Sequence, residues 1–211
     1  MERHWTFNNQ IAQIFDKHAR QHIPDYDRVI DLSINLCKQK VEPAQPILEL
    51  GCAVGETVKR LHKASFSNIH AVDNSQAMLD SCPADLATYY HSSTIPQVDI
   101  KFNAVICNWT LHFIKDKESY LQDIYNCLAP GGIFILSEKV ENQGLALEQY
   151  HQFKRTQGVS DEEIAAKAKS LEGVMFVDSV DWYMSALQTI GFNNIYTANS
   201  NWCFTTLVAI K

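Results

Sequence analysis

PILELGCAVG, at residues 46–55, is a short apolar run that ends in a turn with two glycines. Residues 56–64 follow it with the polar, periodic pattern of a helix. Glycines at positions 51 and 55 suit a turn in which the backbone takes a positive φ or passes close to a ligand. The stretch therefore predicts a strand, a tight turn and a helix whose free N–H groups point at a bound molecule.

The turn differs from the phosphate-binding loop of dinucleotide sites. Its spacing is Gly51-x-Ala53-x-Gly55, so alanine replaces the middle glycine of a GxGxxG-like pattern. This weakens a dinucleotide interpretation. The loop residues remain candidate contacts to a different ligand, namely Gly51, Cys52, Ala53 and Gly55.

Two acidic residues lie close to this turn. Asp73 ends a second apolar run, 22 residues after Gly51, where a carboxylate can accept hydrogen bonds from two ribose hydroxyls. Glu49 would repel a pyrophosphate but suits an ammonium or a sulfonium group. Either residue alone is equally well explained as a helix cap. Together they favour a ribosyl ligand with a positive charge, which means S-adenosylmethionine.

From residue 46 onward, strand patterns alternate with helical patterns, as in a parallel sheet that is covered on both faces. We expect parallel strands at 46–50, 68–72, 86–90, 103–108 and 132–137. We expect helices at 56–64, 75–81 and 116–128, the last of them ended by Pro130-Gly131-Gly132.

The end of the chain reverses direction. A helix at 179–189, closed by Gly191, leads to strands at 193–198 and 202–210. The link at 199–201 is so short that these two strands must pair as an antiparallel hairpin. The predicted fold class is therefore α/β, with a Rossmann-like, seven-stranded, mostly parallel sheet whose last strand is antiparallel and with helices on both faces.

Two amphipathic helices precede the sheet. The apolar face of the first is expected to hold Phe7, Ile11, Ile14, Phe15 and His18. The second follows Pro24 behind a candidate cap at Asp25. Both helices are free to lie over the strand ends. Tyr26, at the start of the second, then either reaches into the site or packs as an ordinary aromatic residue.

Residues 141–177 interrupt the alternation with helical patterns at 145–157 and 161–171. An insertion of this length on the ligand side predicts a lid or part of a homodimer contact. We expect a single domain over 1–211, built from an N-terminal helical lid (1–40), a cofactor-binding core (46–140), the helical insertion (141–177) and a C-terminal helix with hairpin (178–211).

Composition narrows the class of partner. The net charge of −6 disfavours nucleic acid, which needs clustered lysine and arginine, so a small-molecule substrate is the better expectation. No apolar run reaches membrane-spanning length, and the N-terminal stretch MERHWTFNNQ lacks the layout of a secretory signal, so we expect a cytoplasmic protein. The six cysteines are scattered and the histidines do not pair with them at ligand spacing, so no metal site is expected.

The polar residues that follow each strand are the candidates for chemistry, because parallel sheets bind ligands at the carboxyl ends of their strands. Asn108 can bind the methionine end of the ligand or orient a reacting group, and Trp109 can face the sulfonium as a cation–π partner. His112 is a candidate general base, although on a helical turn it is more often a satisfied hydrogen-bond partner.

Several stretches of the chain resemble one family. They are Ile47 to Gly55, Ala71 to Ser75, Asn108 to Leu111, Gly131 to Lys139, Phe153 to Arg155, Leu171 to Met175 and Phe204 to Lys211. These resemble the carboxy-S-adenosylmethionine synthases, which are class I methyltransferase-fold enzymes. Members of that family convert S-adenosylmethionine and prephenate into a carboxylated sulfonium used in tRNA wobble-uridine modification.

The resemblance implies cofactor contacts from Tyr26, Gly51, Asp73, Asn74 and Asn108. Two places depart from the family pattern. Ser93-Thr94 stands where the family places an Asp-Ile pair that reads the adenine amino group, and a hydroxyl can still accept that hydrogen bond, though more weakly.

The second departure concerns the reaction. Alanine occupies position 168, within Lys167-Ala168-Lys169, where the resemblance implies an arginine that grips the new carboxylate. Arginine offers a planar, two-pronged fit that lysine does not reproduce. Lys167, Lys169 or Arg155 are the candidate substitutes for this contact.

Four functions therefore remain open. The default is an S-adenosylmethionine-dependent transferase that methylates a small molecule. The alternatives are a carboxy-S-adenosylmethionine synthase, a cyclase that converts the cofactor itself to azetidine-2-carboxylate with release of methylthioadenosine, and a non-catalytic S-adenosylmethionine-binding protein. Cyclisation would be helped by a closed aromatic pocket of Trp109, Tyr26 and either Tyr150 or Tyr183.

Overall fold

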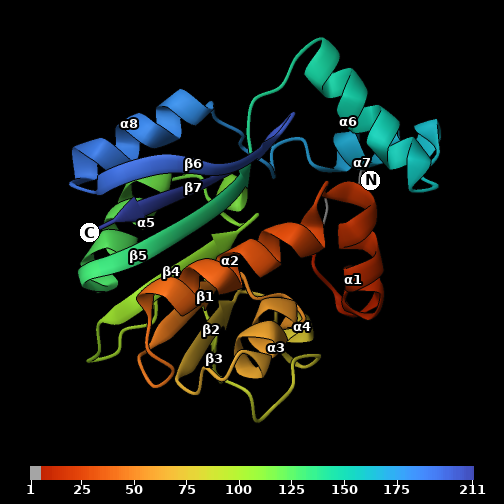
Figure 1. The fold of residues 1–211 in the computed structure, drawn as a ribbon. Coiled ribbons are helices and arrows are strands. Elements are labelled where there is room, and N and C mark those ends of the chain that lie inside the picture. Colours follow the sequence, from red (N-terminus) through yellow and green to blue (C-terminus); the bar gives the residue numbers. More distant parts are fainter. Residues whose placement is uncertain (1–5) are drawn as a thin grey trace.

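One seven-stranded sheet forms the centre of the protein in the computed structural model, which describes residues 6–211. The strands are β1 (Ile47–Leu50), β2 (Ile69–Asp73), β3 (Thr88–His91), β4 (Phe102–Asn108), β5 (Leu128–Lys139), β6 (Asn193–Asn201) and β7 (Phe204–Ile210). Their order is β3-β2-β1-β4-β5-β7-β6 (Figure 1). Only β7 runs antiparallel to its neighbours, β5 and β6. The predicted fold class is confirmed.

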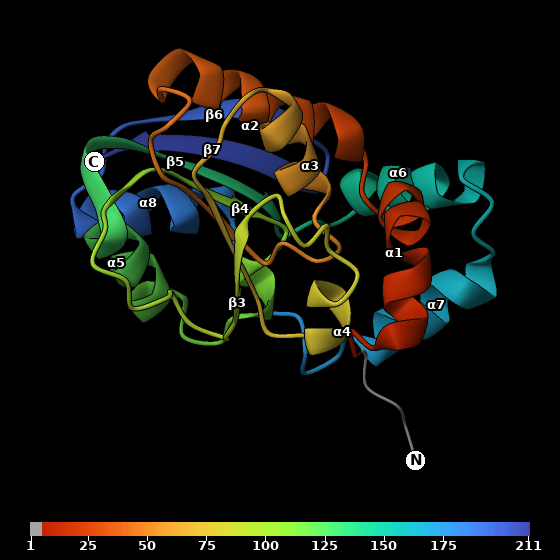
Figure 2. The same ribbon diagram turned by 90° about the horizontal axis from the view of Figure 1, so that it is seen from below.

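Helices cover both faces of this sheet. They are α1 (Asn9–His22), α2 (Tyr26–Lys40), α3 (Glu56–Lys63), α4 (Gln76–Leu79), α5 (Lys117–Cys127), α6 (Leu145–Thr156), α7 (Asp161–Ser170), α8 (Val180–Ile190) and the short 3-10 helix η1 (Leu111–Phe113). The layer of α2 and α3 lies on one side of the sheet, and α5 and α8 lie on the other (Figure 2). Strand β1, which lies between β2 and β4, is buried along its whole length, as expected for a strand between two helical layers.

The remaining helices gather at one end of the sheet. α1, α6 and α7 lie together beyond the end of β5, in both views of the ribbon (Figures 1 and 2). Two hydrogen bonds join these segments, from Tyr150 Oη to His22 O at 2.9 Å and from Gln21 Nε2 to Gln157 O at 3.1 Å. The N-terminal helix and the insertion therefore form one wall over the strand ends.

Two predicted boundaries were wrong. α5 ends at Cys127 and β5 already starts at Leu128, so Pro130-Gly131-Gly132 does not end the helix. This segment instead pairs with the end of the chain, through Gly131 N to Lys211 O and Lys211 N to Gly132 O. The turn between β6 and β7 falls at Trp202-Cys203 rather than at 199–201, because β6 extends to Asn201.

Three local predictions at the helices were also wrong. Ile14 is 51% exposed, so it does not belong to the buried face of α1. Asp25 precedes α2 but its side chain does not cap the helix, because its Oδ2 instead accepts a hydrogen bond from Asn201 Nδ2 at 2.9 Å. α4 is shorter than the expected 75–81 helix and starts after Ser75, whose side chain caps it.

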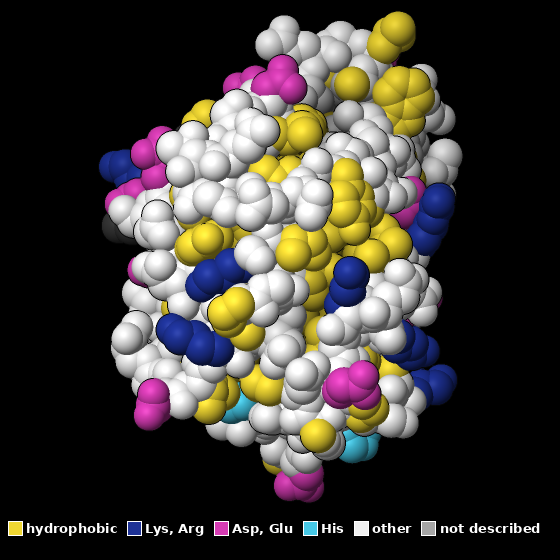
Figure 3. Space-filling model, turned by 60° about the vertical axis from the view of Figure 1, so that its left-hand side comes forward, with side chains coloured by type: hydrophobic (Ala, Val, Ile, Leu, Met, Phe, Trp, Pro, Cys, Tyr) yellow, Lys and Arg dark blue, Asp and Glu magenta, His cyan; other side chains and the backbone are white. Residues whose placement is uncertain are grey.

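The outer surface carries charges of both signs. Acidic and basic side chains are interspersed on the face drawn in Figure 3, with apolar side chains exposed between them. No helix in the described part of the chain is long and apolar enough to span a membrane.

Gly51 is the glycine that the fold requires most strictly. Its φ is +70°, and a Cβ at this position would lie 2.1 Å from Thr110 Oγ1. Gly131 has a similar φ of +74°, but a Cβ there would meet no atom within 4 Å. Alanine substitutions at these two positions therefore distinguish the energetic cost of backbone strain from that of steric overlap.

We predict that Gly131→Ala lowers the free energy of unfolding by about 1–2 kcal/mol, which is the strain of a left-handed alanine. Gly51→Ala should cost roughly 1–3 kcal/mol more, because Thr110 must also move. Urea unfolding followed by circular dichroism measures both values. Equal destabilisation of the two variants would contradict the steric argument.

Candidate functional site

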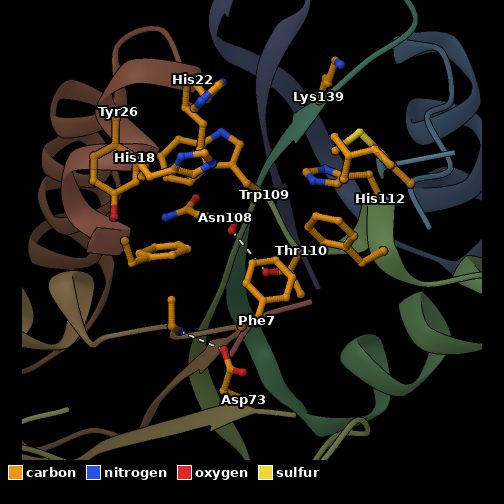
Figure 4. A pocket seen from close by; sticks show the side chains of 18 of the residues that line it. Phe7, His18, His22, Tyr26, Asp73, Asn108, Trp109, Thr110, His112 and Lys139 are labelled. Carbon is orange, nitrogen blue, oxygen red and sulfur yellow. Dashed lines mark hydrogen bonds between the residues drawn. The ribbon is translucent and has the colours of Figure 1, made fainter. Parts of the chain in front are cut away.

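A cavity of about 320 Å³ lies where the glycine turn, the end of β4 and the helical wall meet. Its walls come from β1, β2, β4 and β5 on one side and from α1, α6 and α7 on the other. Figure 4 shows side chains from these elements directed into a common space, with Asp73 at one end and His18, His22 and Lys139 at the other.

Asp73 ends β2 beside the glycine turn. Its Oδ2 accepts a hydrogen bond from Ala53 N at 2.9 Å and its Oδ1 accepts one from Ser75 N at 2.8 Å. Burial raises the pKa of Asp73, and these backbone donors oppose the rise. Each carboxylate oxygen keeps a lone pair beyond its backbone donor, so the pair of oxygens can still accept from ligand hydroxyls.

Glu49 is a buried carboxyl that faces the same cavity. It is 3% exposed, and its Oε2 has no hydrogen-bond partner among the described residues. Burial raises the pKa of Glu49 to about 8, and the nearby Asp73 and Glu56 add to the rise, whereas a hydrogen bond from Thr57 lowers it. A cation placed against this carboxyl would pair with its unsatisfied oxygen and lower the pKa of Glu49 again.

Asn108, the last residue of β4, is the second unsatisfied group. Neither its Oδ1 nor its Nδ2 has a partner within residues 6–211, although the side chain is buried and lines the cavity. Leaving a buried polar group unpaired costs about 1–3 kcal/mol. The amide therefore indicates a ligand that both donates and accepts hydrogen bonds near the end of β4.

An aromatic pair closes the cavity above these groups. The rings of Tyr26 and Trp109 are stacked, with centroids 5.0 Å apart and planes 24° apart. Trp109 has a φ of +56°, which is uncommon for a bulky residue and indicates backbone strain in this turn. Burial raises the pKa of Tyr26, so its hydroxyl stays protonated and cannot act as a base near neutral pH.

Glu138 fixes the turn that carries Trp109. Its carboxylate is 1% exposed and accepts hydrogen bonds from the backbone of Thr110, Leu111 and His112 at 3.0, 2.7 and 3.1 Å. Its Oε2 also lies 2.5 Å from His112 Nδ1. Because one carboxylate holds three successive N–H groups, the turn cannot shift without leaving a buried charge unpaired.

The opposite end of the cavity is basic. Six basic side chains line it, from α1, β5, α6 and α7, and these are His18, His22, Lys139, His151, Lys154 and Lys167. Burial, with repulsion between the lysines, lowers the pKa of Lys154 to about 8 and that of Lys167 to about 6. Burial and the two lysines also lower the pKa of His18 to about 4.

Tyr150 holds two of these lysines in place. The ammonium of Lys154 lies 4.0 Å from the centroid of its ring, and that of Lys139 lies 5.1 Å away. Its hydroxyl donates to His22 O in α1 at 2.9 Å. The ring thus orders the basic end through cation–π contacts.

Most of the residues predicted from the sequence lie around this cavity. The lining contains Tyr26, Glu49, Gly51, Cys52, Ala53, Asp73, Asn74, Ser93, Asn108, Trp109, His112, Tyr150 and Lys167. Gly55, Thr94, Arg155 and Lys169 do not line it. Arg155 instead forms an ion pair with Asp161 at 2.8 Å, and the Thr94 hydroxyl lies 3.1 Å from that of Ser92.

Glu138 and Lys139 were among the residues expected at the carboxyl ends of the strands but were given no role, and His22 was not singled out. Glu138 and Lys139 stand at the end of a strongly apolar strand, and this position marks them as candidates. His18 was assigned only to the packed face of a helix. No local pattern marks His22, because its role depends on how α1 meets α6.

The unsatisfied groups match the chemistry of S-adenosylmethionine. Glu49 and Asn108 suit its amino-acid end, and Asp73 suits its ribose. A metal centre has no such support, because no group of three or more His, Cys, Asp or Glu side chains within residues 6–211 is arranged to hold an ion.

Comparison with known proteins gives the family that the sequence motifs resemble. Residues 48–136 match a methyltransferase domain model. The chain is 32% identical over 225 residues to the carboxy-S-adenosyl-L-methionine synthase of Yersinia pestis (strain Pestoides F), covering 98% of this chain and 84% of the relative.

Solved structures share the fold at low identity. A Thermotoga maritima S-adenosylmethionine-dependent methyltransferase, described as a possible histamine N-methyltransferase, aligns with a TM-score of 0.70 at 15% identity, over 98% of this chain and 99% of that one. Magnesium protoporphyrin IX methyltransferase from Synechocystis PCC 6803, with bound S-adenosylhomocysteine, aligns with a TM-score of 0.64 at 15% identity, over 94% of each chain. The chain therefore belongs to the class I S-adenosylmethionine-dependent methyltransferase superfamily and, within it, to the carboxy-S-adenosyl-L-methionine synthase family.

Proposed function

We propose that this protein is an S-adenosylmethionine-dependent transferase whose second substrate is a small organic anion, with methyl transfer as its default reaction. The observation that carries the proposal is the division of charge in the cavity. The acidic residues that line it, Glu49, Glu56 and Asp73, lie on β1, α3 and β2. The basic end is built from other elements, and Figure 4 shows its His18, His22 and Lys139 across the cavity from Asp73.

The acidic end would hold the cofactor. Asp73 would accept from the ribose hydroxyls, and Glu49 with Asn108 would bind the ammonium and carboxylate of the methionine part. The faces of Tyr26 and Trp109 offer π-density to the sulfonium. When bound, S-adenosylmethionine supplies an activated methyl group, so the protein need only align the acceptor with it.

The basic end would hold the second substrate. Three lysines line this end, Lys139, Lys154 and Lys167, and their side chains suit a carboxylate or phosphate. Apolar side chains lie beside them in the same wall, including Leu147, Leu171, Met175 and Phe204. An anion with a small apolar or aromatic body fits both features.

A second candidate is carboxyl transfer, which yields carboxy-S-adenosylmethionine. It is favoured by the 32% identity to synthases over 98% of the chain and by the position of Ala168, which lines the basic end next to Lys167. In this case the lysines would take over the carboxylate contact that the resemblance assigns to an arginine at this position.

Product analysis separates these reactions. Purified protein is incubated with S-adenosylmethionine alone, with prephenate, and with a panel of hydroxy- and aminobenzoates, and the nucleosides are identified by mass spectrometry. S-adenosylhomocysteine together with a methylated acid supports methyl transfer, and a carboxylated sulfonium supports the second candidate. Methylthioadenosine without an acceptor, or binding without turnover, would contradict both.

We predict that cofactor binding releases a proton from Glu49. At pH 7 a carboxyl with a pKa of about 8 is mostly protonated, and a bound ammonium would ionise it. Affinity for S-adenosylmethionine should therefore rise as the pH increases towards about 8. Calorimetric titration in buffers of different ionisation enthalpy measures the proton release directly.

Glu49→Gln is the matching variant. It should abolish the proton release and weaken S-adenosylmethionine binding roughly 10- to 150-fold, which corresponds to the loss of a charged hydrogen bond worth about 1.5–3 kcal/mol. The exposed Glu42→Gln serves as control. Unchanged proton release in Glu49→Gln would exclude this carboxyl as the ammonium site.

The basic end predicts the opposite pH dependence. An anion raises the pKa of a neighbouring lysine, so binding should take up protons above about pH 6, where Lys167 is mostly neutral in the free protein. Affinity for prephenate or benzoate should then fall as the pH rises. Lys167→Met should remove most of this uptake, whereas Lys169→Met, outside the cavity, should not. Binding that strengthens with pH would contradict an anion site.

Restoring arginine tests the second candidate. Ala168→Arg should raise formation of the carboxylated sulfonium from prephenate at least tenfold, because a planar guanidinium can pair with a carboxylate through two hydrogen bonds. Ala166→Arg, exposed on the same helix, is the matched control. Equal product yields from both variants would count against carboxyl transfer.

A further inference from the structure

Glu138 accepts one more hydrogen bond, from His112, than is needed to hold the turn. Three backbone N–H groups already satisfy Glu138, yet its Oε2 also accepts from the imidazole of His112 at 2.5 Å. Both side chains are at least 95% buried. From the other side, Phe176 N donates to His112 O at 2.7 Å, so the histidine is fixed in position as well as in orientation.

This contact selects one tautomer of the imidazole. A carboxylate at Nδ1 requires a proton on that nitrogen, so in the neutral imidazole Nε2 carries no proton and acts as an acceptor. The His112 side chain lines the cavity, and Figure 4 shows its ring turned to the interior across from Trp109. The structure thus presents an oriented proton acceptor next to the turn that carries Asn108.

Other titratable groups around the pair cannot take this role. Cys107 on β4 and Tyr183 on α8 lie close enough for the charge of Glu138 to affect them, and Tyr120 on α5 lies close to Cys107. Burial raises the pKa of all three, so they stay protonated near neutral pH. Asp73, in the same lining, is held by Ala53 and Ser75 at the ribose end.

We propose that His112 is the proton acceptor of the transfer reaction and that Glu138 is the residue that positions it. This rests on the proposed methyl transfer to an acceptor that carries an O–H or N–H group besides its anion. As the new bond from oxygen or nitrogen to the methyl carbon forms, the methyl–sulfur bond breaks with its electron pair left on sulfur. The acceptor's proton moves to Nε2 of His112, and the charges balance.

His112→Asn tests the proton acceptor. The asparagine amide can still donate to Glu138 from near the position of Nδ1, but it has no nitrogen in place of Nε2. We expect kcat to fall roughly 10²- to 10⁴-fold, while the melting temperature and the Kd for S-adenosylmethionine stay unchanged. His62→Asn, on the exposed side of α3, is the control. An unchanged kcat in His112→Asn would overturn the proposal.

A spectroscopic measurement tests the positioning without turnover. Long-range ¹H–¹⁵N NMR of the wild-type imidazoles should show His112 with its proton on Nδ1 in the cofactor-free protein. Glu138→Gln should increase the Nε2–H form and lower kcat, because that form cannot accept a proton. A wild-type His112 with its proton on Nε2 would overturn the proposal even if neither variant folds.

Failure of the proposed function and failure of the His112 role give different experimental results. If the wild-type protein methylates no acceptor, then the proposed function fails and the proton acceptor with it. If the wild-type protein is active and His112→Asn is equally active, then only the role of His112 is wrong.

Discussion

The close approach of two turns determines the geometry of the site. Gly51, after β1, lies so near Thr110, after β4, that even a methyl group would overlap its hydroxyl. The same hydroxyl donates to Leu50 O at 3.1 Å, and Glu138 on β5 holds the Thr110 N–H. Three adjacent strands are thereby joined at their carboxyl ends. Groups that would bind different parts of one ligand are consequently held by the rigid sheet instead of by mobile loops.

This frame holds ionisable groups in buried surroundings that disfavour their charged forms. Burial pushes the carboxyl of Glu49 towards its neutral form, and it pushes the ammonium groups of Lys154 and Lys167 the same way. Each group regains its charge when an oppositely charged ligand arrives. A cationic cofactor and an anionic second substrate would also attract each other across the cavity, so that each strengthens the binding of the other. Under the proposed function, the electrostatic cost in the free protein would be recovered only when ligands of the matching charges bind.

Local sequence patterns were sufficient for the sheet and for the placement of Glu49 and Asp73 in one cavity, because both depend on short-range signals. The run at 46–50, its glycine turn and Asp73 have a fixed spacing along the chain. The start of β5 was mispredicted because Pro130 and Gly131 resemble a helix stop, whereas a contact with Lys211 pairs this segment with the end of the chain. The basic end was predicted only in part, through Lys167, for a related reason. His22 and Lys154 are 132 residues apart, and only the packing of α1 against α6 and α7 gives them a common function.

The match to the methyltransferase domain model covers one end of the cavity and leaves out the other. Residues 48–136 contain Glu49, Asp73 and Asn108, but the basic end lies outside them. Under the proposed function, most contacts to the donor, apart from Tyr26, would lie in the part matched by the methyltransferase domain, and contacts to the acceptor would lie in elements before and after it. A fold shared at 15% identity cannot specify the reaction. Under the proposed function, the choice between methyl and carboxyl transfer would be made by α1, α6 and α7, where Ala168 stands beside Lys167, whose charge would depend on the ligand.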